Sequence, residues 1–308
     1  MKVKQINRIL YFVCGIGAIL FAFAIFLPKN GKSLPKPFKS ALLNPQYRNT
    51  VDSISIEKDG KKIALEKSGE FWLAISDDTT ILAENKIVDS LLDEATKIRN
   101  LYKISAGKTS WEQLSLGEEN ATKITFAKKS DRVYTKSYFG VQNSITNRLA
   151  LRTITTDSAY ETENSFQQFL TTDINYWGIG EIFTEIENLT QVTLSIEGKT
   201  KTLSSDNEDF GAKSHDLLSL RHGKINSESS IGTEPPVASI TAQSGNGRYV
   251  KIDFYKASDN PEIDYLYTKK VYPSKIDSTE AQFAFNQQKN ACEVSNWTFN
   301  RIKEIFGL

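Results

Sequence analysis

Few residues in this chain have the types and spacing for acid, base or nucleophilic chemistry. His215 and His222 would share one helix face only if a helix reached the second of them, and Gly223 favours an end there. A zinc site needs further carboxylate, thiolate or imidazole ligands at matching spacing, and none accompanies these two. Cys292 has no neighbouring histidine to activate its thiol. We therefore expect no catalytic residue, no metal site and no cofactor.

The familiar catalytic motifs are also missing from the sequence. It contains no Gly-x-Ser-x-Gly elbow, no phosphate loop and no His-Glu-x-x-His pair. Acidic residues cluster at 206–209 and 259–264, but neither cluster has the glycine and final glutamate of a calcium-binding loop. We expect both clusters to be solvated turns.

Composition limits the remaining classes of protein. A chain of 308 residues with 39% hydrophobic and 24% charged residues suits one or two folded domains. Two cysteines exclude a disulfide framework. Beyond residue 40 acidic side chains outnumber basic ones, which argues against general nucleic-acid binding because phosphates require a cationic face.

A hydrophobic segment near the N-terminus has the length of a membrane span. Residues 9–27 contain no charged or strongly polar side chain, and a helix of about 20 such residues matches a hydrocarbon core of about 30 Å. We predict an uncleaved transmembrane helix that acts as a signal anchor. Its residues include Ile9, Leu10, Gly15, Gly17, Leu20, Phe23 and Leu27.

The predicted orientation follows from the short basic tail before this segment. Lys2, Lys4 and Arg8 favour a tail that stays in the cytoplasm. Residues 28–308 would then lie outside a bacterial cytoplasmic membrane, on its periplasmic side. A cleaved signal peptide is the alternative, because Ala-Phe-Ala at 22–24 has the small-x-small pattern of a cleavage site.

The remainder of the chain contains an internal repeat. Residues 54–72 match residues 192–210 at a constant offset of 138, and residues 124–138 match residues 240–254 at an offset of 116. Offsets that shrink in order are expected when one copy has shorter loops. We therefore predict two tandem copies of one unit.

Each predicted copy combines hairpins with helices. Residues on both sides of Asp59-Gly60 alternate apolar with polar, which is typical of a β-hairpin, and the apolar spacing over 84–99 indicates an amphipathic helix. We predict an α+β fold in which an N-terminal transmembrane helix precedes two tandem copies of an antiparallel hairpin–helix–hairpin–helix module. Trp177 and Trp297 would close the two cores. The predicted parts are 1–28 (tail and transmembrane helix), 29–50 (tether), 51–188 (first copy) and 189–308 (second copy).

The order of short motifs resembles that of a bacterial family. A basic tail and one span lead to Gly69-Glu-Phe-Trp72-Leu, then Leu116-Gly117, Arg132-Val-Tyr134, Tyr138-Phe-Gly140 and Trp177. This series resembles the bacterial domain-of-unknown-function family 4340 over most of residues 50–270. The resemblance implies a membrane-anchored envelope protein encoded beside components of ABC transport systems of the gliding-motility type. It implies no catalytic residues.

Three functional hypotheses follow from these features. The first is a non-catalytic, membrane-anchored extracytoplasmic accessory protein that binds subunits of an ABC-type transporter. The second is an envelope module that binds a glycan, lipid or peptide between the two copies, with Tyr134, Tyr138, Tyr255 and Tyr267 as ligand-facing aromatics. The third, an envelope hydrolase, would need convergent carboxylates or a nucleophile paired with a base. Oligomeric state does not follow from the sequence.

Overall fold

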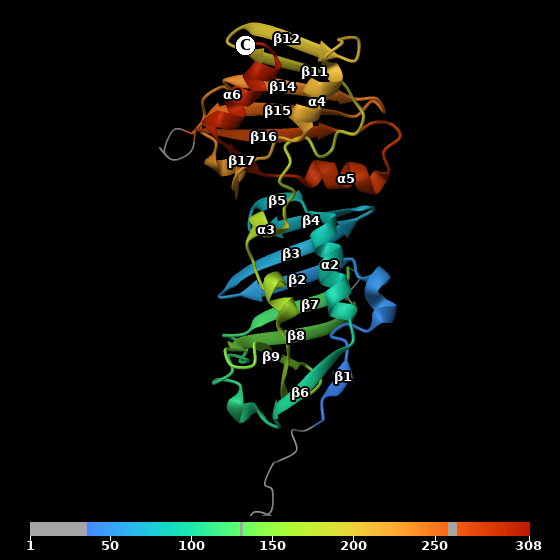
Figure 1. The fold of residues 1–308 in the computed structure, drawn as a ribbon, viewed down its shortest axis with the longest axis vertical. Coiled ribbons are helices and arrows are strands. Elements are labelled where there is room, and N and C mark those ends of the chain that lie inside the picture. The colour runs from blue at the N-terminus through green and yellow to red at the C-terminus, as the bar shows by residue number, and fades with distance from the viewer. Residues whose placement is uncertain (1–35, 130–131, 258–263) are drawn as a thin grey trace, which may run out of the picture. The chain divides into compact units, whose positions relative to one another are not determined.

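The protein is built around two large sheets, shown in Figure 1. A computed structural model describes residues 36–129, 132–257 and 264–308, and residues 39–308 form one compact unit. The first sheet contains β1 (Phe38–Ser40), β2 (Ser53–Lys58), β3 (Lys61–Ser68), β4 (Phe71–Ser76), β5 (Thr79–Leu82), β6 (Arg99–Ser105), β7 (Thr122–Lys128), β8 (Arg132–Asn143), β9 (Arg148–Thr153) and β10 (Ala159–Glu163). The second contains β11 (Leu189–Ile196), β12 (Lys199–Ser204), β13 (Ile225–Asn226), β14 (Ala238–Ser244), β15 (Tyr249–Lys256), β16 (Tyr265–Tyr272) and β17 (Ala291–Val294).

The described helices are short, and all but α6 lie between strands in the chain. The α-helices are α2 (Asn85–Thr96), α3 (Ile174–Trp177), α4 (Phe210–Leu218), α5 (Thr279–Gln287) and α6 (Asn296–Ile305). The 3₁₀ helices are η1 (Pro45–Thr50), η2 (Lys108–Ser110), η3 (Asn164–Phe169) and η4 (Glu228–Ser230). Serine caps begin α5 and α6, because the hydroxyls of Ser278 and Ser295 accept backbone N–H groups at each start.

The predicted α+β architecture is wrong. The hairpin at Asp59-Gly60 is confirmed, but β2 pairs with β7 as well as with β3, so neighbouring hairpins merge into one continuous sheet. The order in the first sheet is β1-β6-β10-β9-β8-β7-β2-β3-β4-β5. The chain is therefore mainly antiparallel β-sheet, and it does not consist of hairpin–helix–hairpin–helix modules.

The predicted membrane helix also requires correction. Residues 9–27 lie outside the described residues, and within the described ranges no helix is long and apolar enough to cross a membrane. The longest of these helices, α2, has 12 residues, which gives a length of about 18 Å against a hydrocarbon core of about 30 Å. A fold that begins with a transmembrane signal anchor is thus not supported by the structure.

The two sheets share a strand order and a register. The second sheet runs β12-β11-β14-β15-β16-β17-β13, which corresponds to β3-β2-β7-β8-β9-β10-β6 in the first. The hairpin turns at their starts have the same backbone, with positive φ at Asp59 and Gly60 and at Glu197 and Gly198. When positions are counted from these turns, Ile56 corresponds to Leu194. The partner of Ile56 on β7, Ile124, then corresponds to the partner of Leu194 on β14, Ile240. The first sheet adds β1, β4 and β5, and the second adds α5.

Each sheet buries one face under helices. In the first, α2 contributes Val88, Leu91, Leu92 and Ala95 to the core, and in the second α6 contributes Phe299, Ile302 and Ile305 (Figure 1). We call the opposite face of each sheet its outer face. Trp177 is fully buried as predicted, whereas Trp297 is 72% exposed in the first turn of α6 and closes no core.

Helix α5 joins the second half of the chain to the first. It packs against β3, β4 and β5 on the outer face of the first sheet, and the hydroxyl of Ser68 donates to the carbonyl of Glu280 at 2.8 Å. Backbone pairing between Thr80 and Lys289 continues the contact. The two sheets are therefore held together by side-chain packing and by backbone hydrogen bonds.

Candidate functional site

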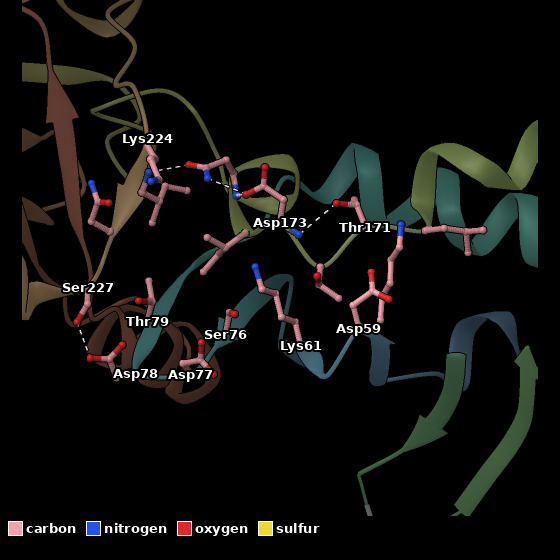
Figure 2. A pocket seen from close by; sticks show the side chains of 17 residues that line it. Asp59, Lys61, Ser76, Asp77, Asp78, Thr79, Thr171, Asp173, Lys224 and Ser227 are labelled. Carbon is pink, nitrogen blue, oxygen red and sulfur yellow. Dashed lines mark hydrogen bonds between the residues drawn. The ribbon is translucent and has the colours of Figure 1, made fainter. Parts of the chain in front are cut away.

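An open cavity of about 700 Å³ lies where the two sheets meet (Figure 2). We call it the intersheet cavity. Four segments line it: the β2–β3 turn, the β4–β5 turn, residues 170–175 after η3, and residues 224–227 around β13. Its position depends on both sheets, so neither half of the chain forms it alone.

The carboxylates at this cavity already take part in the local structure. Asp78 accepts a hydrogen bond from the Ser227 hydroxyl at 2.5 Å, which lowers the pKa of Asp78. Asp173 caps α3 by accepting from the backbone N–H of Asn175 at 3.0 Å. The side-chain oxygen of Asn175 in turn accepts from the backbone N–H of Ile225 at 2.6 Å. These bonds tie the segments of the cavity together.

The cavity presents both signs of charge. Figure 2 shows Lys61 between the Asp78–Ser227 pair at one end and Asp59 at the other. Over the described ranges, no group of three or more His, Cys, Asp or Glu is placed to hold a metal ion. This lining of lysines, carboxylates, hydroxyls and amides can form hydrogen bonds with a polar ligand or with a protein surface.

The two histidines considered from the sequence are not brought together in one helix. His215 is exposed on α4, which ends at Leu218, so His222 lies beyond it. The ring of His222 contacts two backbone carbonyls, with Nδ1 2.8 Å from Gly223 O and Nε2 2.7 Å from Ile179 O. Burial lowers the pKa of His222 even though both carbonyls favour the protonated ring. Through its contact with Ile179, His222 is held against the segment that connects β10 with β11.

Cys292 is buried, and the pKa of its thiol is too high for a nucleophile. Its side chain is 1% exposed on β17, and burial raises the pKa of the thiol to about 11. The attacking form of cysteine is the thiolate, which is scarce at neutral pH when the pKa is that high. The neighbouring Tyr267 is also buried, and burial raises the pKa of its hydroxyl.

The four tyrosines predicted to face a ligand do not form a common site. Tyr138 lies on the outer face of the first sheet, where its hydroxyl donates to Glu118 Oε1 at 2.8 Å, and Tyr134 stacks on Tyr47 with 4.4 Å between ring centroids. Tyr255 belongs to the second sheet, and Tyr267 is in its core. None of the four lines the intersheet cavity.

Sequence reasoning missed the residues that form this cavity. Asp78 and Ser227 are 149 residues apart in the chain, and no local pattern relates them. The signal available in the sequence was an aspartate at each turn, Asp59 and Asp77. Aspartate tolerates a left-handed backbone, and both residues have positive φ. That signal predicts turns but does not show that the two turns meet.

Comparison with known proteins returned no match among family models, curated proteins or solved structures. The resemblance to family 4340 therefore remains a prediction from short motifs.

Proposed function

We propose that this chain is a non-catalytic accessory protein of the bacterial envelope that binds an ABC-type transport complex. One observation carries the non-catalytic part: the groups best suited to chemistry are engaged in the structure. Both ring nitrogens of His222 contact carbonyls, and the Cys292 thiol is buried with a raised pKa. A general base or nucleophile must instead be exposed to substrate and titrate near the working pH.

The carboxyl groups support the same proposal. A general acid at neutral pH requires a carboxyl group whose pKa is raised. Throughout the described part of the chain, the carboxyl groups with shifted pKa values are all shifted downward by hydrogen bonds or cations: Asp78, Glu118, Asp209 and Asp277. These carboxylates are suited to holding loops and to meeting cationic or donor groups of a partner.

The transport complex and the location outside the cytoplasm are supported by the family resemblance. To test the partner, the tagged full-length chain would be cross-linked in its native cells, purified in mild detergent and analysed by mass spectrometry. Transporter subunits that recur in replicates, and that a reverse purification from the transporter side also recovers, would support the proposal. Recovery of the chain alone after cross-linking would refute the transporter partner.

The location has its own test. A C-terminal fusion to alkaline phosphatase, which is active only outside the cytoplasm, is expected to be active in whole cells. A matched fusion to a reporter that requires the cytoplasm should be inactive. The opposite pattern would contradict an extracytoplasmic position whatever the partner proves to be.

The intersheet cavity favours a second candidate function, the binding of a small polar ligand such as a glycan. Its lining carries lysines, carboxylates and amides from both sheets, which are the groups that recognise hydroxyl-rich ligands. Titration calorimetry with envelope oligosaccharides should then give binding that Lys61→Glu and Asn175→Ala weaken about tenfold. Equal binding by the chain and both variants would exclude this cavity as the ligand site.

A further inference from the structure

At β8 and β9 the outer face of the first sheet is covered by residues 106–121, the connection between β6 and β7, which we call the covering segment. There the Arg152 guanidinium lies over two rings, with its central carbon 3.5 Å from the Tyr138 ring centroid and 3.9 Å from that of Trp111. Arg152 Nε donates to Leu116 O at 2.8 Å, and Glu118 accepts from Arg152 and Tyr138. The covering segment thus supplies one aromatic ring, one carbonyl and one carboxylate.

Register identifies the corresponding place on the second sheet. In the first sheet Lys123 pairs with Tyr138, which pairs with Arg152. Ile124 and Ile240 hold corresponding positions in the two sheets. The residues just before them, Lys123 and Ser239, therefore correspond as well. Ser239 pairs with Asp253, which pairs with Thr268. Asp253 and Thr268 therefore occupy the positions of Tyr138 and Arg152.

This corresponding place is an open cavity of about 590 Å³, which we call the second-sheet cavity. Lys251, Asp253, Thr268 and Lys270 form its floor on β15 and β16, and Phe285 of α5 lies at its border. The connection between β13 and β14 borders it with Glu228 and Ile231, but residues 227–237 contain no aromatic residue. The space that the Trp111 ring fills in the first sheet is left open in the second.

On the floor of the cavity two lysines face one aspartate, and Glu228 adds a carboxylate at the border. Lys251 Nζ is 2.8 Å from Asp253 Oδ2, so these two charges neutralise each other. Lys270 is exposed, and its ammonium lies 5.3 Å from the Tyr272 ring centroid. Of the carboxylates that the structure describes, none forms a salt bridge with Lys270. A carboxylate entering the cavity would meet this ammonium.

We propose that the second-sheet cavity binds a peptide segment of a partner protein that carries an aromatic side chain and a carboxylate. The first sheet shows such a segment in place: Trp111 and Glu118 cover the positions that Asp253 and Thr268 occupy in the second sheet. This inference rests on the proposed function, because it identifies the surface through which a protein partner is bound. A peptide backbone laid over the sheet also finds hydroxyl and ammonium donors for its carbonyls.

Selection of displayed random 12-residue peptides against the full-length chain tests this proposal. Enriched peptides should contain an aromatic and an acidic residue, and fluorescence anisotropy of synthetic copies measures their affinity. Lys270→Glu should weaken binding at least tenfold by repelling the carboxylate, and Thr268→Trp should weaken it as much by filling the cavity. Lys201→Glu and Thr200→Trp make the same chemical changes on the exposed edge strand β12 and should leave binding unchanged.

The outcomes separate this site from the proposed function. Loss of binding in both cavity variants, with unchanged thermal unfolding and intact binding in both edge variants, would support the site. Enriched peptides without the two residue types, or binding retained in both cavity variants, would overturn it. Transporter subunits recovered equally with wild type and Lys270→Glu would refute the site and leave the transporter partner standing. Peptide binding at the cavity without transporter recovery would refute the transporter alone.

Discussion

The ring of Phe285 on α5 lies 5.1 Å from the ring of Phe71 on β4, measured between centroids. This contact joins a helix inserted in the second half of the chain to the outer face of the first sheet. Arg248 adds a cation 4.6 Å from the Phe285 ring centroid. Phe285 is 3% exposed, so it belongs to the continuous core that connects both sheets.

Phe285→Ala is expected to destabilise the chain by about 3–5 kcal/mol, because it removes a buried ring and leaves a cavity. Urea unfolding followed by fluorescence and circular dichroism measures the loss. Phe283→Ala is the matched control on the same helix, since Phe283 is 52% exposed, and it should change stability by less than about 0.5 kcal/mol. Equal effects of the two substitutions would contradict the packing of α5 between the sheets.

The local part of this fold was predictable from sequence, whereas the joining of its parts was not. The hairpin at Asp59-Gly60 depends on adjacent residues and was predicted correctly. The pairing of Ile56 with Ile124 joins strands distant in sequence, and alternation alone does not select a partner strand. Trp297 matches Trp177 by spacing, yet only Trp177 is buried, because a residue type does not specify which face of a helix meets the core.

The candidate sites were harder still to predict. Asp78 and Ser227 meet because contacts distant in sequence fix one sheet against the other, among them the packing of α5 and the Thr80–Lys289 pairing. The second-sheet cavity arises because residues 227–237 lack a counterpart of Trp111, and that difference becomes visible once the registers are compared. Both sites depend on long-range geometry.

Gly140 is required by the covering segment of the first sheet. A Cβ atom at this position would lie 1.8 Å from the carbonyl oxygen of Leu114, which accepts the backbone N–H of Val141. Gly140→Ala should therefore displace the segment and cost about 1–3 kcal/mol. Limited proteolysis between residues 106 and 121 and thermal unfolding measure both effects.

Gly117→Ala provides the control for this prediction. No atom lies within 4 Å of a Cβ built at Gly117, so this substitution should leave the proteolysis rate and the melting temperature nearly unchanged. If Gly140→Ala resisted protease as wild type does, the close contact with Leu114 would be excluded.

Asp277 should give the chain a specific loss of stability in acid. It pairs with Arg248 at 2.5 and 3.1 Å, and this pairing lowers the pKa of Asp277 in the folded state. The stabilisation is complete above the usual aspartate pKa of about 3.9 and is lost as the pH falls through the lower folded-state value. Asp277→Asn should cost about 3 kcal/mol at pH 7, because Arg248 keeps a nearly buried charge without its partner.

The measurement is urea unfolding of wild type and Asp277→Asn between pH 7 and pH 3. The difference between their free energies of unfolding should be constant near neutrality and should shrink in acid. Glu228→Gln, at a half-buried acid of η4, should run parallel to wild type throughout. A constant difference down to pH 3 would show that the Asp277 pKa is not lowered.

Cys292 should react with thiol reagents only when the chain unfolds. The sequence has two cysteines, so Cys14→Ser leaves Cys292 as the sole thiol. Because burial raises its pKa to about 11 and its side chain is 1% exposed, labelling by a disulfide reagent at pH 8 should be at least about 100-fold slower than for free cysteine. Guanidinium chloride should restore the rate of an exposed thiol. Rapid labelling of the folded chain would instead reveal an accessible thiolate, and the assignment of Cys292 as a packing residue of β17 would then be wrong.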